Sequence, residues 1–150
     1  MLIYGICYYY KNNKVQNIIN HIKCFNNIKK DNDIFCLNIM IDSFDKKLYI
    51  EIENKFGELL QLNGILNYKI LVDFNSGGTV LGLYNTFNYF KNNNENDYIA
   101  FFEEDFYSIN DNWLNHSLNI LNSNDYIYIG EHIPSKNTVI QNNYLYRVYL

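Results

Sequence analysis

Short apolar runs alternate with longer amphipathic stretches along this 150-residue chain. The apolar runs have the length of β-strands, and we expect strands at residues 2–10, 34–41, 68–73, 97–102 and 125–130. Between them, apolar residues recur every three or four positions, which predicts helices at residues 14–29, 46–62, 79–91 and about 110–121. Unbroken apolar strands that alternate with helices are typical of a mostly parallel sheet with helices on both faces. We therefore predict an α/β fold.

Two further expectations concern how these segments pack. The helix at 79–91 places Leu83, Phe87 and Phe90 on one side, which predicts its buried face. The tail at residues 139–148 alternates apolar and polar positions, which predicts an edge strand. No linker or change of composition divides the chain, so we expect one domain over residues 1–150.

Composition and charge narrow the functional classes. The chain is 48% apolar and 17% aromatic, which supplies a core, and its net charge is −4 with dispersed lysines and arginines. Without a basic stripe, no nucleic-acid partner is expected. No apolar run reaches the roughly 20 residues that cross a bilayer, and the first residues lack a signal-peptide pattern. Cys7, Cys24 and Cys36 are odd in number and far apart, as free thiols in a reducing compartment would be, so a cytoplasmic location is expected.

Polar residues follow four of the predicted strands, at residues 9–12, 42–45, 75–78 and 103–105. Ligands of open parallel sheets bind beyond the carboxyl ends of the strands, near the point where the strand order reverses. These four segments are therefore expected to converge on one crevice.

The acidic run Glu103, Glu104 and Asp105 has the most specific chemistry. Because side chains alternate along a strand, Glu103 and Asp105 are expected to point one way and Glu104 the other. Two such carboxylates can hold one Mg²⁺ or Mn²⁺, with water and phosphate oxygens as the other ligands. The alternative is a solvated acidic loop that approaches a helix N-terminus.

Each of the other candidates has a structural alternative. Gly77 and Gly78 let the backbone lie close to a ligand, or simply form a turn that leads into a helix. Asp42 can accept hydrogen bonds from a nucleobase or ribose, or cap the next helix. His21, His116 and His132 are isolated in the sequence and are expected to be surface or satisfied core residues. Cys7 lies inside a predicted buried strand, a poor environment for a nucleophile.

The order of these segments resembles the N-terminal half of a family 2-like GT-A glycosyltransferase. Tyr10-Lys11-Asn12 is similar to the end of the first strand in that family, and IDSFDKK at 41–47 to its acidic second turn. FNSGGTVLGLYNTF at 74–87 and YIAFFEEDF at 98–106 resemble the asparagine–glycine block and the D-x-D signature. NWLNHSLNILNSNDYIYIG at 112–130 follows the usual helix and strand after it, so the resemblance covers residues 2–131.

The resemblance implies a UDP- or GDP-sugar donor, Mn²⁺ or Mg²⁺, and transfer of the sugar to a hydroxyl of a glycan, protein or lipid acceptor. It assigns the donor to Tyr10, Asp42, Asn75, Gly77, Gly78 and Glu103. It assigns the metal to Glu103 and Asp105. Family members continue beyond this point with an acceptor region, so the chain is expected to be truncated there or minimal, and Glu131 is the candidate general base.

Other functions remain open from the sequence. A non-catalytic module for nucleotide-sugar binding or assembly would keep the fold and lose the acceptor chemistry. A sugar nucleotidyltransferase would share the fold and the metal, but residues 9–12 lack its glycine-rich, arginine-bearing loop. In an unrelated α/β protein, the acidic run would bind neither metal nor nucleotide. A homo-oligomer is compatible with each of these.

Overall fold

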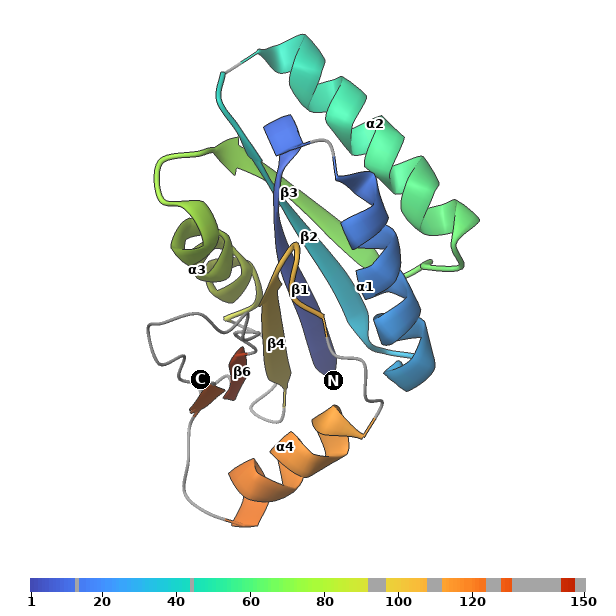
Figure 1. Cartoon of the computed structure of the whole chain (residues 1–150), viewed down its shortest axis with the longest axis vertical. Helices are drawn as coiled ribbons and strands as arrows, with labels where there is room; N and C mark the ends of the chain where they lie inside the picture. Colours follow the sequence, from blue (N-terminus) through green and yellow to red (C-terminus); the bar gives the residue numbers. More distant parts are fainter. Residues whose placement is uncertain are drawn as a thin grey trace.

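Four parallel strands form the centre of the fold in the order β3–β2–β1–β4 (Figure 1). They are β1 (Leu2–Tyr9), β2 (Ile34–Ile41), β3 (Tyr68–Phe74) and β4 (Tyr98–Glu103). The computed structural model describes residues 1–12, 14–43, 45–91, 97–107, 112–123, 128–130 and 144–147. The strand order reverses between β1 and β4, because β2 and β3 were added on the other side of β1. The predicted α/β class is confirmed, with a Rossmann-like parallel sheet.

Two short strands extend the sheet beyond β4. They are β5 (Tyr128–Gly130) and β6 (Tyr144–Arg147), and β6 pairs antiparallel with both β4 and β5. The expectation of an edge strand in the tail is therefore wrong in position, because β6 lies between β4 and β5. Alternation along a strand shows that its two faces differ, but it carries no information about the strand's neighbours.

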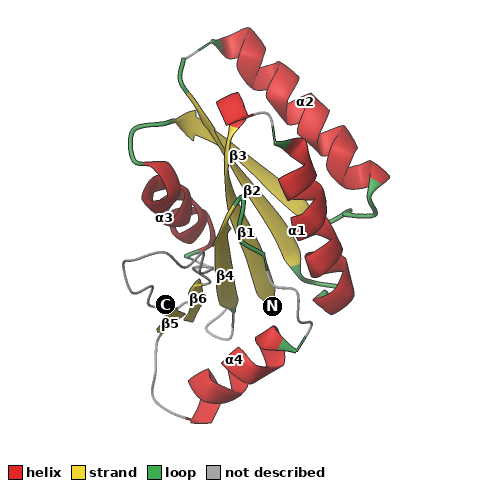
Figure 2. Ribbon diagram, viewed as in Figure 1, coloured by secondary structure: helices red, strands yellow, loops and turns green. Residues whose placement is uncertain are grey.

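Helices cover both faces of the sheet (Figure 2). The short 3₁₀ helix η1 (Tyr10–Asn12) follows β1, and the α-helices are α1 (Val15–Ile28), α2 (Lys46–Leu62), α3 (Gly78–Phe90) and α4 (Trp113–Ser123). Helices α1, α2 and α4 pack into one core cluster, and α3 lies on the opposite face against β1 and β2. In the described part of the chain, no helix is long and apolar enough to cross a membrane.

The larger core lies between the sheet and α1, α2 and α4. Tyr4 of β1 is fully buried there, and its ring centroid lies 5.5 Å from that of Phe25 and 4.6 Å from that of Phe102. The ring of Trp113 in α4 packs edge-on against Phe102 at 5.4 Å. These aromatic contacts join one strand pair to two helices that are distant in sequence.

On the opposite face, α3 contacts the sheet through small residues. Gly82 and Thr86 are buried in α3, and a Cβ atom at Gly82 would lie 3.0 Å from Cys7 Sγ. Of the predicted buried side, Phe90 is buried and Leu83 is partly buried against the same core, whereas Phe87 is 41% exposed, so the prediction is wrong for Phe87. The helix turns its smallest residues toward the sheet because they allow the closest approach of the two backbones.

Gly5 of β1 provides a test of this close approach. A Cβ atom at Gly5 would lie 2.8 Å from Cδ2 of the fully buried Phe101. We expect Gly5→Ala to lower the free energy of unfolding by about 1–3 kcal/mol through overpacking, as measured by urea denaturation. Gly57→Ala is the matched control, because the nearest atom to its Cβ is the Tyr68 hydroxyl at 3.1 Å, the end of a movable side chain. An equal loss in both variants would contradict close packing at Gly5.

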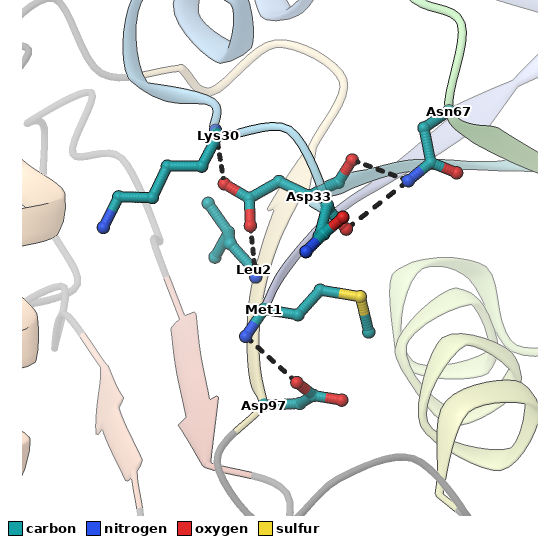
Figure 3. Close-up of polar contacts among 7 residues, drawn as sticks. Met1, Leu2, Lys30, Asp33, Asn67 and Asp97 are labelled. Atoms are coloured by element: carbon teal, nitrogen blue, oxygen red, sulfur yellow. Dashed lines mark hydrogen bonds and ion pairs between the residues drawn. The ribbon is translucent and has the colours of Figure 1, made fainter.

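Hydrogen bonds and an ion pair connect the amino ends of the strands (Figure 3). The buried Asp33 carboxylate accepts a 2.7 Å hydrogen bond from the Leu2 amide, and Asn67 Nδ2 donates to the Asp33 carbonyl at 3.1 Å. The Met1 amine lies 3.0 Å from Asp97 Oδ1. Because the four strands are parallel, the polar segments that follow them lie together at the opposite, carboxyl end of the sheet.

Candidate functional site

An open pocket of about 270 Å³ lies at the carboxyl ends of β1 and β4, where the strand order reverses. Its walls come from both strands, from β2, and from the loop that leads into α3. The lining residues are Cys7, Tyr9, Met40, Asn75, Gly78, Thr79, Glu103, Glu104 and Asp105. This is the place at which open parallel sheets generally bind their ligands.

The acidic run forms a turn at the rim of this pocket. Glu103 is the last residue of β4, and the Phe106 amide donates to the Glu103 carbonyl at 3.2 Å. Glu104 was expected to point away, but it is 8% exposed and its Oε2 accepts a 2.9 Å hydrogen bond from the Tyr9 amide. That expectation is wrong because the strand ends at Glu103, so the alternation of side chains stops there. All three carboxylates therefore line one pocket.

His21 of α1 hydrogen-bonds the backbone of this turn. Its Nε2 lies 3.0 Å from the Glu103 carbonyl oxygen and 3.2 Å from that of Glu104, and its Nδ1 lies 3.0 Å from the Tyr4 hydroxyl. Carbonyl oxygens only accept, so Nε2 carries the proton and Nδ1 accepts from Tyr4. Burial lowers the pKa of His21 to about 4, although the two carbonyl bonds oppose that shift. The imidazole is thus neutral at pH 7 and positions the acidic turn.

The pocket has a strongly negative lining. Three of its lining side chains are carboxylic acids, and none of the described lining residues is a lysine or arginine. Carboxylate oxygens are the ligands that Mg²⁺ and Mn²⁺ prefer, so the donor chemistry fits such an ion. Within the described ranges, however, no group of three His, Cys, Asp or Glu side chains is placed to hold a metal. A cation at this turn would need oxygens from a ligand or from water to complete its coordination.

The first turn of α3 lines the same pocket as the acids. Its N-cap is Gly77, which has no side chain to bond the first amides, and Gly78 has a φ of +54°. Such a φ favours glycine over every residue that carries a Cβ. Gly78 and Thr79 both line the pocket. Helix N-termini attract anions because their first amides lack partners within the helix.

Cys7 lies at the floor of the pocket but is not suited to nucleophilic chemistry. Its thiol is 3.7 Å from the Gly78 carbonyl oxygen. Burial raises its pKa to about 12, and the negative charges of Glu104 and Glu103 add to this effect. The thiol is therefore protonated at neutral pH, which agrees with the expectation that Cys7 is not a nucleophile.

A second polar cluster lies beside the first, at the carboxyl ends of β1 and β2. The Tyr9 hydroxyl donates to Asp42 Oδ1 and Oδ2 at 2.7 and 2.6 Å, and Lys11 Nζ lies 3.6 Å from Oδ2. The Tyr9 hydrogen bond, helped by the Lys11 charge, lowers the pKa of Asp42. Asp42 does not cap α2, since the cap is Asp45, which accepts from the Lys47 amide at 2.8 Å.

This cluster borders a second open pocket of about 470 Å³. Tyr10 and Asp42 line it together with Lys11, Ile41, Ser43 and Leu48. Tyr9 lines the acidic pocket and also bonds Asp42 of the second pocket, so these two side chains form the border between the two pockets. Both pockets open at the carboxyl edge of the sheet.

The residues assigned from the sequence are thus found in two neighbouring places. The acidic pocket brings together Asn75, Gly78, Glu103 and Asp105. Tyr10 and Asp42 lie in the second pocket, Gly77 caps α3 next to the first, and Glu131 lies outside the described residues.

The structure adds two residues that the sequence interpretation did not place at the site, His21 and Thr79. It also gives Tyr9 and Glu104, which lie in the predicted segments, specific hydrogen bonds there. For His21, a signal was present in the sequence. It lies on the apolar side of α1 with Ile18, Ile22 and Phe25, so its ring had to be buried.

The fold and the pocket define an α/β protein with a Rossmann-like sheet and an acidic crevice at its switch point. Comparisons with protein-family models, with curated proteins and with solved structures find no match. A function for this chain has to be inferred from the geometry of the crevice and from the motifs that line it.

Proposed function

We propose that this chain is a metal-dependent glycosyltransferase, or the donor-binding domain of one. It would transfer a sugar from a nucleotide-diphospho-sugar to a hydroxyl group of an acceptor. The observation that carries the proposal is the convergence of Asn75, Gly78, Glu103 and Asp105 on one pocket at the switch point. These residues come from two separate motifs of the resemblance to GT-A glycosyltransferases.

The charge of the pocket supports the requirement for a metal. A diphosphate that approached Glu103, Glu104 and Asp105 would be repelled, and no described lining residue is a lysine or arginine that compensates. A divalent cation on Glu103 and Asp105 would supply the missing positive charge, and it would neutralise the charge that develops on the leaving diphosphate. Glu104 would not bind the metal, because its carboxylate accepts the hydrogen bond of the Tyr9 amide.

The two pockets suggest how a donor would be divided between them. The diphosphate and sugar would occupy the acidic pocket, which the first turn of α3 and the three acidic residues line together. The nucleoside fits the second pocket, where the Asp42 carboxylate can accept from a base or ribose. The bond from the Tyr9 hydroxyl fixes the Asp42 carboxylate at the border between these two parts.

Acceptor chemistry needs a further group. A general base must take the proton of the attacking hydroxyl. Among the described carboxylates of the pocket, Glu103 and Asp105 would hold the metal and Glu104 accepts from the Tyr9 amide. Glu131 remains the candidate base, at the end of the last motif of the resemblance. A chain that binds donor but lacks this base would be a non-catalytic binding module, the alternative function.

Calorimetric titration with UDP- and GDP-sugars, with and without Mn²⁺, tests the proposal. We expect saturable binding that requires Mn²⁺ and that Asp105→Ala weakens by about tenfold or more. The matched control is Glu53→Ala, which removes an exposed acid from α2 and leaves the pocket intact. Binding with unchanged affinity in Asp105→Ala would remove Asp105 from the metal site.

The same titration separates the candidate functions. Sugar transfer or donor hydrolysis in addition to binding identifies an enzyme, whereas binding alone identifies the non-catalytic module. If no nucleotide binds under any metal condition, the glycosyltransferase proposal fails and the acidic run is a solvated turn.

A further inference from the structure

The outer face of helix α3 is apolar. The exposed side chains of this helix are Val80, Tyr84, Phe87 and Tyr89, and none of them is charged. Val80 is 77% exposed and Tyr84 is 61% exposed. The outer face of α2, by contrast, carries exposed charged side chains at Lys46, Lys47, Glu51, Glu53, Lys55 and Glu58. A contiguous apolar patch on the surface of a folded protein marks a site that binds another molecule.

Three of these side chains form a continuous stripe with a hollow beside it. Val80, Tyr84 and Phe87 are spaced by four and three positions and therefore share one side of the helix. A groove of about 260 Å³ is lined by Val80, Leu83, Tyr84, Phe87 and Ile99, which are all apolar or aromatic. Ile99 is a fully buried residue of β4, so the groove reaches the sheet beside the helix. The same face of the molecule thus carries both projecting side chains and a hollow that can receive them.

No described helix of the same chain fills this groove. In the described part of the chain, α3 is the only helix on its face of the sheet, while α1, α2 and α4 pack into the core on the other face (Figure 2). Parallel sheets are generally covered by helices on both faces. The groove beside Ile99 is therefore available to a helix of another molecule.

We propose that α3 packs antiparallel against α3 of a second copy of this chain, with a twofold axis that passes between Leu83 and Tyr84. Residues at equal distances from this axis along the two helices then face one another. Val80 opposes Phe87 of the partner subunit, and Leu83 opposes Tyr84 of the partner subunit. The contact is isologous, because each pair occurs twice about the axis.

The positions of the four apolar residues select this axis. Val80 and Phe87 are equidistant from it, as are Leu83 and Tyr84, so each large ring meets an aliphatic side chain. An axis through Tyr84 would instead oppose Val80 to the polar Asn88, and one through Leu83 would oppose Val80 to the fully buried Thr86. Only the axis between Leu83 and Tyr84 pairs the four groove-lining residues of α3 with one another.

The absence of charge favours a second copy over other partners. No residue from Asn75 to Phe90 is charged, so self-pairing buries no charge and opposes no like charges. A partner with a charged surface would bury its charges without compensation. Helices that lie on membranes carry lysines and arginines beside their apolar face, and α3 has neither. Antiparallel pairing also brings each helix N-terminus toward the C-terminus of the other helix, where the helix dipoles attract.

Sedimentation equilibrium over a concentration series tests the dimer, independently of any nucleotide. We expect the wild-type chain to dimerise, and Val80→Lys alone or Phe87→Glu alone to weaken dimerisation by about tenfold or more, because each buries unpaired charges. Ile50→Glu is the matched control, because Ile50 is a 49% exposed apolar residue of α2 and should leave the dimer unchanged. A wild-type chain that stays monomeric, or single variants that dimerise like the wild type, would overturn the proposal.

The double variant Val80→Lys/Phe87→Glu tests the register. It places a lysine opposite a glutamate of the partner subunit twice, so it is expected to dimerise more tightly than either single variant. A double variant that dimerises no better than the single variants would contradict the axis between Leu83 and Tyr84. Both side chains are exposed in the monomer, so the substitutions act on the dimer. For the same reason, variants of the exposed Tyr84 change the affinity of the dimer and not the stability of the dissociated chain.

A cross-link tests the same contact without a change of charge. Tyr84 would lie next to the twofold axis and therefore close to Tyr84 of the partner subunit. Mild oxidation of Tyr84→Cys is expected to give a disulfide-linked dimer on non-reducing electrophoresis. Tyr89→Cys is the matched control, because Tyr89 is a 52% exposed residue of the same helix that lies outside the stripe, against Lys69. Equal cross-linking of both variants, or of neither, would contradict the pairing of the two helices.

Discussion

Lowering the pH from 6.5 to 4 is expected to reduce the free energy of unfolding by about 3 kcal/mol through His21 alone. Burial lowers the pKa of this histidine from 6.5 to about 4 in the folded chain, while in the unfolded chain it keeps its ordinary value. In this window the unfolded state binds a proton that the folded state does not. The stability is therefore fully present above pH 6.5, falls as the pH drops, and loses nothing further from His21 below about 4.

Urea denaturation at a series of pH values measures this slope. His21→Gln removes the titrating ring. The variant should be less stable than the wild type at pH 7, and its free energy of unfolding should change little between pH 6.5 and 4 except through the carboxylates. His116→Gln is the matched control, because His116 is exposed on α4 and should leave the slope unchanged. A His21→Gln chain with the wild-type slope would show that other groups cause the acid sensitivity.

The elements of the fold were predictable because each strand is a separate apolar run. The predicted strand at 34–41 and the helix at 46–62 match β2 and α2 residue for residue, and β1, β3, β4, α1 and α3 begin and end within one residue of their predicted bounds. Parallel strands buried on both faces are apolar along their whole length, so their ends coincide with the first polar residues. For the same reason, the meeting of residues 75–78 with residues 103–105 at one edge of the sheet followed from the sequence.

What was not predictable depends on distances between segments. Glu104 turns into the pocket because the chain leaves the strand at Glu103, and periodicity does not show where a turn begins. Helix α3 buries Gly82 and Thr86 because β1 offers Gly5 and Cys7 at the same level. A hydrophobicity pattern gives small residues no strong preference for the core, so it missed Gly82 and Thr86 and placed the exposed Phe87 there.

The role of His21 likewise appears only in three dimensions. Its two ring nitrogens connect the Tyr4 hydroxyl of β1 with the carbonyls of Glu103 and Glu104 at the end of the neighbouring strand β4. His21 in the first helix thereby holds the backbone of Glu103 and Glu104, which lie 82 and 83 residues later in the chain. The stability of the core and the geometry of the candidate site are therefore linked through one imidazole.

Tyr4→Ala is expected to lower the free energy of unfolding by about 3–5 kcal/mol, as measured by urea denaturation. The ring is fully buried and packs against Phe25, Phe35 and Phe102, so its removal leaves a cavity among rings from β2, β4 and α1. Tyr84→Ala on α3 is the matched control, because that ring is 61% exposed and should cost less than about 1 kcal/mol.

Tyr4→Phe separates the hydroxyl from the ring. It keeps the aromatic packing and removes only the O–H that His21 Nδ1 accepts, so about 1–2 kcal/mol should be lost. Because that hydrogen bond stabilises the neutral imidazole, its removal should also raise the pKa of His21 and reduce the loss of stability between pH 6.5 and 4. A Tyr4→Phe chain with an unchanged acid slope would mean that burial alone keeps His21 neutral and that the Tyr4 hydroxyl contributes only to packing.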